Sequence, residues 1–490
     1  MAYNEVTKYL QKAIYPFHMP GHKRNPDFLP PNLLELDMTE LPEMDVLSNP
    51  KKGLKDMQRR FTEIYDTKQT FLLVNGSTAG ITAAILATCN QNTTIMVPRN
   101  AHKSVYNAIF LSGATPQYVM PEITEDGLAG GVSPQAFANM PQGAVALVVS
   151  PTYEGFISDI AGISKVVKER GGTLIVDAAH GAHLKFMQRA INSDIALSAM
   201  MPGDEPSGPK SLEGKYFSDT KDIVQTHLGA DIVIESLHKT LPMLGQTATL
   251  HITKTSNVDP GYIQGMINAV QTSSPSYILM AAADFALDKL RSNPILFTSY
   301  LWRLEALRSK LPSMVINESI RLRGEEMLGK HGIYALDPSK LLFYHPVQPG
   351  DLRLTEHVLA EIDGVAMEMA AGNHILAMTT VADTPEGFAK LEKAIERLNQ
   401  ANMDFEPNPE TLIIPTIPEM VLTPREAMQI PSVEVPWKES LGKVSAQIIA
   451  KTPPGIAIVA PGERIPDTLP PGIFTDSPFR KETVRIVPNV

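Results

Sequence analysis

Short apolar runs alternate with helical patterns from Thr70 onward, and this alternation restricts the fold of the chain more than any other feature. The apolar, β-rich runs lie near residues 70–75, 94–98, 116–120, 144–150, 173–179, 230–237 and 246–252, and helical patterns lie near 80–90, 101–112 and 158–170. The run at 144–149 has no polar alternation, which is typical of a strand covered on both faces. The pattern predicts an α/β fold in which helices cover both faces of a mainly parallel sheet.

The length of 490 residues predicts more than one domain. Prolines between Pro16 and Pro50 predict that residues 1–69 form an extended arm and linker. A large domain is expected at 70–295, closed by a helix from about Ser276 to Arg291, and a small α/β domain is expected at 296–400. The proline-rich segment near Pro407 then leads into a C-terminal α+β module at 401–490. Residues 187–226 are polar and turn-rich, which predicts a long surface loop that is either a lid or mobile.

Composition narrows the classes of partner. The net charge of −10 is spread along the chain and no Lys/Arg run is present, which argues against nucleic-acid and membrane-surface partners and favours a small molecule. Cys89 is the single cysteine, so an intrachain disulfide is impossible, a cysteine-based zinc site is excluded, and a reducing cytoplasm is the expected location. The sequence starts without a signal-peptide pattern and has no run of eighteen apolar residues, so neither secretion nor membrane spanning is expected.

A lysine and a carboxylate stand at the ends of two predicted strands. Lys239 lies in Ser236-Leu237-His238-Lys239-Thr240, after the run 230–234, and Asp177 closes the run that begins at 173. Pyridoxal phosphate needs a lysine amine for a Schiff base with its aldehyde and a carboxylate that keeps its ring nitrogen protonated. Opposite charges about 4 Å apart attract by roughly 4 kcal/mol at an effective dielectric of 20, enough to hold that proton. Alone, Asp177 also fits a helix cap or a solvated strand end, but the pair predicts pyridoxal phosphate.

Other polar residues follow neighbouring strands. The turn at 75–80 (NGSTAG) joins a strand to a helix and fits either a phosphate site or a simple helix cap. His102 begins a predicted helix and fits either a structural or a catalytic role. His180 and His183 have the residue type of metal ligands, but no HExxH pattern accompanies them and no metal is expected. Ligands of such sheets bind outside the carboxyl ends of the strands, where Ser77, His102, Asp177 and Lys239 converge.

With these residues in view, the chain resembles the Orn/Lys/Arg decarboxylase family almost end to end, in its short form without an amino-terminal wing domain. The resemblance implies an aspartate-aminotransferase-like large domain of pyridoxal-phosphate fold type I. The motifs that carry it are residues 16–24 (PFHMPGHKR), Glu40-Leu41-Pro42, 75–78 (NGST), 99–104 (RNAHKS), 177–183 (DAAHGAH), 236–240 (SLHKT), 272–277 (TSSPSY), 423–427 (TPREA), 453–455 (PPG) and 461–463 (PGE). Two departures are Ala178, where the family has Glu, and the longer loop at 187–226.

The resemblance assigns roles to individual residues. It implies that Lys239 carries the cofactor as a Schiff base, that Asp177 pairs with the ring nitrogen, that His102 stacks on the ring, and that His180 faces the ring or the substrate. It also implies a homodimer or larger assembly with shared sites, in which Ser273 or Ser274 and the arm around Glu40-Leu41-Pro42 reach the partner's site. The cofactor contacts it implies are Ser77, Thr78, Ala79, His102, Asp177, Ala179, Ser236, His238, Lys239, Ser273 and Ser274, of which Ser77, Thr78, Ser236 and His238 hold the phosphate.

The expected reaction is decarboxylation of a basic amino acid to an amine. Arginine is the first expectation, because the short family members that this chain resembles are arginine decarboxylases of polyamine synthesis, and lysine or ornithine are the alternatives. An aminotransferase or aldolase on the same fold would use the same lysine and aspartate, but no arginine stands out as a carboxylate clamp near the end of the small domain, where residues 373–378 contain none. A regulatory protein that keeps the fold without the chemistry is less consistent with intact Lys239 and Asp177.

Overall fold

A computed structural model describes residues 11–490 apart from 13, 42, 192–223, 225–227, 315–320, 345–358, 372–373, 401–415, 452–455, 468–482 and 489. Most of the predicted loop at 187–226 lies outside these described residues. Its first residues, 187–191, complete helix α6 (Leu184–Ile191).

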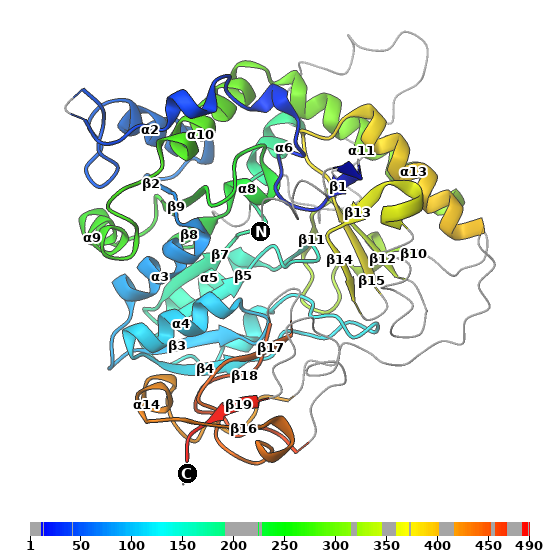
Figure 1. Cartoon of the computed structure of the whole chain (residues 1–490). Coiled ribbons are helices and arrows are strands. Elements are labelled where there is room, and N and C mark those ends of the chain that lie inside the picture. Colours follow the sequence, from blue (N-terminus) through cyan, green and yellow to red (C-terminus); the bar gives the residue numbers. More distant parts are fainter. Residues whose placement is uncertain are drawn as a thin grey trace.

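A seven-stranded sheet forms the centre of the molecule (Figure 1). Its strand order is β2-β9-β8-β7-β5-β3-β4, and in this sheet β9 runs antiparallel to both of its neighbours while the strands from β8 to β4 are parallel. The prediction of a mainly parallel sheet is therefore confirmed. The strands are β2 (Gln69–Leu73), β3 (Thr94–Pro98), β4 (Thr115–Val119), β5 (Val145–Val149), β7 (Thr173–Asp177), β8 (Ile232–Glu235) and β9 (Ala248–Ile252).

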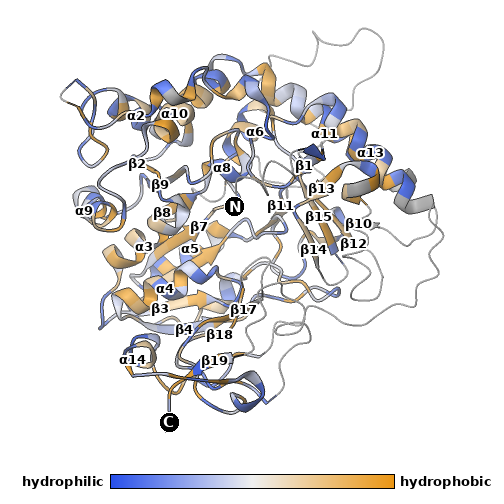
Figure 2. Cartoon of the chain, viewed as in Figure 1, coloured by the Kyte–Doolittle hydropathy of each residue, from blue (hydrophilic) through white to orange (hydrophobic). Residues whose placement is uncertain are grey.

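Helices pack around this sheet as the sequence predicts. Residues 79–85 of α3 are all buried, and Figure 2 shows the orange of apolar residues on α3 and on the central strands. A Cβ atom at Gly80 would lie 2.7 Å from Leu73 Cδ1, so glycine allows α3 to approach β2 closely. The helices are α3 (Gly76–Thr88), α4 (Lys103–Ser112), α5 (Ile160–Glu169), α6, α8 (Leu237–Thr240), α9 (Pro260–Val270) and α10 (Tyr277–Ser292).

The N-terminal segment differs from the predicted extended arm. Helix α2 (Gly53–Tyr65) lies within it and buries Met57, Phe61 and Tyr65. The prolines that suggested an extended chain end at Pro50, and the apolar residues beyond them recur at helical spacing. The segment before α2 is mostly irregular, with a short strand β1 (Tyr15–Phe17) that pairs in parallel with β13 (Val365–Met367).

A smaller antiparallel sheet follows in sequence, with strand order β10-β12-β15-β14. Figure 1 shows α11 and α13 beside this sheet. A short antiparallel pair, β6 with β11, joins it to a loop that follows β5. The elements are β6 (Phe156–Ile157), α11 (Ile295–Met314), β10 (Arg321–Leu322), β11 (Ala335–Leu336), β12 (Lys340–Tyr344), β14 (Met369–Ala371), β15 (His374–Met378) and α13 (Pro385–Gln400).

The C-terminal residues form two small antiparallel pairs, β16 with β19 and β17 with β18. They lie beside β4 and α4 at one edge of the molecule (Figure 1). The elements are α14 (Pro424–Gln429), β16 (Val433–Pro436), β17 (Ile449–Lys451), β18 (Ile456–Val459) and β19 (Thr483–Ile486). The predicted boundaries at 69, 295 and 400 stay predictions. Within the described residues, no helix combines the length and apolar character needed to cross a membrane.

Candidate active site

Asp177 and Lys239 meet at the carboxyl ends of adjacent parallel strands. Asp177 closes β7 opposite Ile234 of β8, and the chain then turns through Ser236 into the single-turn helix α8 that carries Lys239. Asp177 is 3% exposed and its Oδ1 accepts a hydrogen bond from the Ala179 N–H at 3.2 Å. The predicted convergence of these two residues is present in the structure.

The charges of the two groups influence each other. Burial raises the pKa of Asp177, and the positive charge of Lys239 opposes that rise. Burial lowers the pKa of Lys239, while Asp177 and Glu368 partly offset the decrease. The site therefore favours an amine that gives up its proton more easily than a free lysine, which suits attack on an aldehyde.

His180 lies between two lysines. Its Nε2 atom is 3.1 Å from Lys239 Nζ, and its Nδ1 atom is 3.2 Å from Lys340 Nζ. Burial, and then the two lysines, hold the pKa of His180 well below its ordinary value, so the imidazole is neutral. His183 is not beside Lys239: its Nε2 lies 2.9 Å from Asp337 Oδ1, in the turn before β12.

His102 is the N-cap of α4. Its Nδ1 accepts a hydrogen bond from the Ser104 N–H at 3.2 Å, which fixes the ring orientation at the first turn of the helix. Burial and the nearby Lys239 and Lys103 lower the pKa of His102 to about 4. A neutral, oriented imidazole close to Lys239 is suited to stacking on an aromatic ring.

The predicted phosphate-binding residues lie on two turns. Ser77, Thr78 and Ala79 occupy the first turn of α3, where backbone N–H groups have no partner within the helix. His238 is half-buried, and its Nδ1 donates to the Thr247 carbonyl at 2.9 Å. Ser236 is fully buried, and its Oγ has no hydrogen-bond partner among the described residues.

Ser273 and Ser274 are exposed on the chain surface. The segment is tied to the start of α3 in the same chain, because the Thr272 N–H donates to Asn75 Oδ1 at 3.2 Å. In the arm, Glu40 accepts a hydrogen bond from the Leu47 N–H at 3.3 Å, and Leu41 is 41% exposed. Pro42 lies outside the described residues, and the contact of these segments with a partner stays a prediction.

Three parts of the site were not found from the sequence. Lys340 opens β12 at a position that is 3% exposed, and Glu368 lies between β13 and β14, where it accepts hydrogen bonds from Tyr153 OH and the Met19 N–H, each at 2.9 Å. The arm also contacts the site, since the Gly21 N–H donates to the His238 carbonyl at 2.7 Å. The signal that identified Lys239, a lysine that follows an apolar strand, does not apply to Lys340, which precedes the apolar residues of β12.

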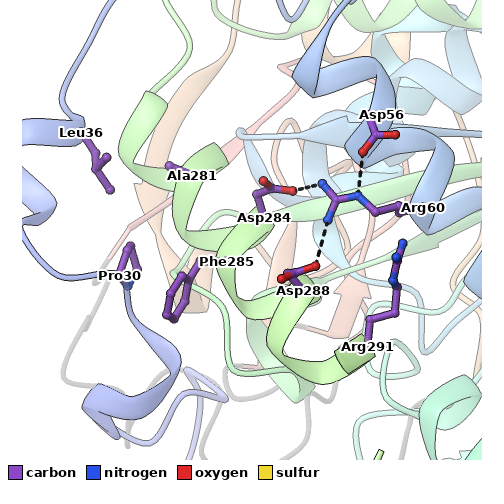
Figure 3. Close-up of a pocket in the computed structure, with 9 residues that line it drawn as sticks. All are labelled: Pro30, Leu36, Asp56, Arg60, Ala281, Asp284, Phe285, Asp288 and Arg291. Atoms are coloured by element: carbon purple, nitrogen blue, oxygen red, sulfur yellow. Dashed lines mark hydrogen bonds and ion pairs between the residues drawn. The ribbon is translucent and has the colours of Figure 1, made fainter. Parts of the chain in front are cut away.

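A separate surface cavity of about 570 Å³ lies between the arm, α2 and α10 (Figure 3). Arg60 points into this cavity and is ion-paired with Asp56, Asp284 and Asp288. The charged groups of the cavity wall therefore largely compensate one another. None of the residues at the Lys239 site lines it. Among the described residues, no cluster of three or more His, Cys, Asp or Glu side chains is arranged to hold a metal ion.

The residues fit pyridoxal phosphate. Lys239 supplies the amine, Asp177 the buried carboxylate for the ring nitrogen, and His102 a neutral ring. The buried Ser236 Oγ without a partner and the open N–H groups of the α3 turn are suited to a phosphate. What the arrangement can do is form an imine with a carbonyl compound and stabilise positive charge on a heteroaromatic ring.

Known proteins with a similar sequence or structure identify the fold of this chain. An arginine decarboxylase of Bacillus subtilis is 28% identical over 482 residues, which cover 94% of this chain and 90% of that protein. The lysine decarboxylase structure from Francisella novicida superposes with a TM-score of 0.71 at 17% identity, covering 94% of this chain and 76% of that one. A serine palmitoyltransferase solved with pyridoxal phosphate gives a TM-score of 0.53 at 14% identity, covering 79% and 88%, so the fold is that of pyridoxal-phosphate fold type I.

Two models of one protein family match most of the chain. The model of the Orn/Lys/Arg decarboxylase major domain matches residues 2–209 and 219–349, and the model of the C-terminal domain of that family matches residues 410–473. The expectation from the motifs is confirmed: this chain belongs to the Orn/Lys/Arg decarboxylase family.

Proposed function

We propose that this protein removes the α-carboxylate of L-arginine as carbon dioxide, with pyridoxal phosphate bound at Lys239. The observation that carries the proposal is the meeting of Asp177 and Lys239 at adjacent strand ends in a chain of this family. Arginine is favoured over lysine because the similarity to the B. subtilis arginine decarboxylase spans nearly all of both chains. Lysine or ornithine is the second candidate.

When bound, pyridoxal phosphate accepts the electron pair that the departing carboxylate leaves behind. In this proposal Asp177 keeps a proton on the ring nitrogen, and His102 packs against the ring face. Ser77, Thr78, Ser236 and His238 hold the phosphate, with Ala79 and Ala179 beside the cofactor and Ser273 or Ser274 contributed to the partner's site. The protein must also orient the substrate so that the bond to the carboxylate stands perpendicular to the ring, which favours its cleavage over loss of the α-proton.

Decarboxylation consumes one proton, which replaces the carboxylate on the α-carbon. Lys239 Nζ and His180 Nε2, 3.1 Å apart, are placed to hold that proton in the site. The part-buried Glu368 carboxylate, fixed by Tyr153 OH and the Met19 N–H, is our candidate for meeting the distal cation of the substrate. It lies close enough to Lys239 to affect the charge of that amine.

Assembly, location and pathway are part of the same proposal. A homodimer is proposed as the smallest functional unit, supported by the exposed Ser273, Ser274 and Leu41 beside segments that the family motifs identify. A cytoplasmic location and a role in polyamine synthesis are proposed from the single, buried cysteine and from the arginine substrate.

The deciding experiment is a side-by-side assay of carbon dioxide release from arginine, lysine and ornithine, with and without added pyridoxal phosphate. Arginine is expected to give the highest kcat/KM, and keto-acid formation in place of carbon dioxide would identify an aminotransferase. A purified protein that cannot be loaded with cofactor would favour the regulatory alternative.

A variant tests the role of the lysine. Lys239→Ala is expected to lose both the imine absorbance of the bound cofactor and all measurable turnover, because no other group replaces the amine. The exposed Lys254, ion-paired with Asp66 at the surface, provides the matched control, and Lys254→Ala is expected to retain both properties. Turnover in Lys239→Ala would contradict the assignment.

A further inference from the structure

The Lys340 side chain reaches the site along a path that the fold leaves open for it. Lys340 opens β12, and its stem passes Gly155, where a Cβ atom would lie 2.7 Å from Lys340 Cγ and 2.9 Å from Lys340 Cβ. Gly155 also has a φ of +98°, which few other residues adopt. A buried lysine stem therefore occupies the space that a side chain at 155 would need, and its ammonium end stops at His180.

The hydrogen bonds available to these groups restrict their protonation. A neutral imidazole has one N–H donor and one acceptor nitrogen, whereas an ammonium group only donates. His180 has a lysine on each ring nitrogen, at 3.1 and 3.2 Å. If both contacts are hydrogen bonds to a neutral ring, one lysine donates as an ammonium and the other accepts as a free amine.

We propose that Lys340, His180 and Lys239 form a proton relay, in which Lys340 is the buried proton store that returns a proton to the Lys239 amine in each turnover. This inference rests on the proposed role of Lys239 in the decarboxylation. It assigns a function to a lysine that no motif of the sequence identified.

The relay has two states that differ by the position of one positive charge. In the first, the Lys340 ammonium donates to His180 Nδ1, and the His180 Nε2–H donates to the Lys239 amine. One N–H bond breaks at Lys340 as one forms at His180 Nδ1, while the Nε2–H bond breaks as one forms at Lys239. Lys340 is then a free amine, Lys239 an ammonium and His180 the other neutral tautomer. The Lys239 ammonium gives the proton that replaces the lost carboxylate, and one proton from solvent restores the Lys340 ammonium as the His180 proton returns to Nε2, so each turnover consumes one proton.

The surroundings hold the ring in place for this exchange. The Tyr153 ring packs edge-on against His180 with the ring centroids 5.2 Å apart. The same loop is fixed three residues later, where His183 contacts Asp337 and Ser339 Oγ at 2.9 and 3.0 Å. Both histidines of the DAAHGAH motif thus contact the turn and strand that carry Lys340.

The charge environment gives Lys340 a suitable acidity. Burial lowers the pKa of Lys340 to about 8, Asp337 and Glu368 partly offset that effect, and Lys239 and Lys23 add to it. Glu154 also interacts with Lys340 electrostatically, and His180 is its neutral contact. A lysine with a pKa near the working pH can both give up and regain a proton, which an ordinary lysine does poorly.

The primary test measures the protonation of the His180 ring rather than the rate of the reaction. Holoenzyme labelled with ¹⁵N in its imidazole rings is titrated from pH 6.5 to 9.5 by NMR, with the His180 signals assigned by their loss in His180→Gln. The two ring nitrogens of His180 are expected to change shift together near pH 8, as Lys340 loses its proton. An unchanged pair of shifts across this range in the wild-type protein overturns the proposal without any variant at Lys340.

Two substitutions separate a relay from a fixed charge. Lys340→Met removes the proton store, and Lys340→Arg keeps a positive donor that does not give up its proton. Both are expected to abolish the titration near pH 8 and to lower kcat about 100-fold, the lower end of general acid–base effects, with KM and cofactor absorbance little changed. Recovery of the wild-type kcat by Lys340→Arg would overturn the relay, because a charge alone would then suffice.

Lys23→Met is the matched control. Lys23 is also buried, but its Nζ donates to the carbonyls of His18 and Met378 at 2.9 and 2.8 Å and is not bonded to His180. The His180 titration is expected to persist in this variant, and its loss would show that the signal depends on general charge and not on the Lys340 contact. If arginine were not the substrate, the titration would be unaffected, so failure of the proposed function and failure of the relay are distinguishable.

Discussion

The buried environment of Asp177 disfavours the ionised form of its carboxylate. Burial favours its neutral form, and the positive charge of Lys239 opposes this effect. A protonated pyridine nitrogen would add a second positive charge beside the carboxylate. The residue is therefore expected to be ionised when the cofactor is bound, and its charge is expected to set the protonation of the ring.

Replacing Asp177 by Asn tests this expectation. The amide keeps the size and removes a charge interaction of about 4 kcal/mol, so kcat is expected to fall about 1,000-fold. The measurement is steady-state kinetics with arginine, at saturating cofactor. A cofactor analogue methylated on its ring nitrogen, which is permanently positive, is expected to restore part of the activity, and a kcat within tenfold of wild type would contradict the role of Asp177.

Strand ends explain which site residues the sequence predicted. Asp177 and Lys239 were identifiable because each follows an apolar run and because ligands of parallel sheets gather at these ends. Lys340 and Glu368 lie on or beside strands of the smaller sheet, and nothing local in the sequence indicates that this sheet faces His180. Their contribution depends on how two sheets pack, which strand patterns do not encode.

At the scale of elements, α8 is held by a segment far from it in sequence. The Gly21 N–H donates to the His238 carbonyl, and a Cβ atom at position 21 would lie 2.5 Å from the Leu241 carbonyl oxygen. The backbone of the arm thus contacts the backbone of the single turn that carries Lys239, with no room for a side chain between them.

Gly21→Ala is expected to separate the arm from α8. Overpacking of this kind costs about 1 to 3 kcal/mol, so both Tm and cofactor affinity are expected to fall. Thermal unfolding and titration with pyridoxal phosphate measure the two effects. Gly245 follows α8 by a few residues and has open space around its Cβ position, so Gly245→Ala is the control. Equal Tm values for the two variants would argue against a tight contact.

The order of strands and helices in the large domain was predictable, because the period of the apolar pattern changes clearly between β and α segments. Helix α2 was not predicted, because the prolines up to Pro50 indicate an irregular chain, although Met57, Phe61 and Tyr65 beyond them have helical spacing. The reversed direction of β9 was also not predictable, since antiparallel pairing depends on the path of the connection and not on the composition of the strand.

At the scale of the whole molecule, a buried ion pair joins the C-terminal residues to the large domain. Arg99, 1% exposed, contacts both oxygens of the fully buried Glu463 at 2.8 and 3.1 Å and donates to the Ile458 carbonyl. Its guanidinium also lies 4.6 Å from the centre of the Tyr118 ring. Three residues along the chain, His102 makes a backbone bridge with Ile456. The C-terminal module therefore contacts the segment that presents His102.

Breaking this ion pair is expected to lower the free energy of unfolding substantially. Glu463→Gln leaves a buried arginine without its counter-charge, and a loss of about 3 to 5 kcal/mol in the free energy of unfolding is expected from urea denaturation. The double variant Arg99→Met with Glu463→Met is expected to lose less, because no charge stays buried alone. The exposed pair of Arg464 with Glu419 is the control, and Glu419→Gln is expected to cost at most about 1 kcal/mol. A similar cost for both pairs would contradict the role of the Arg99–Glu463 ion pair in stabilising the fold.

The pairing of the first strand with a late one sets the order in which the protein can mature. Tyr15 donates a hydrogen bond to Asp383, 368 residues further along, and β1 has no partner strand until residues 365–367 exist. At about 5 to 20 residues per second, a ribosome needs roughly 20 to 70 seconds to make the intervening chain. The first residues to be synthesised are thus among the last to reach their folded positions. A newly made chain cannot complete the surroundings of Lys239 until most of it has left the exit tunnel.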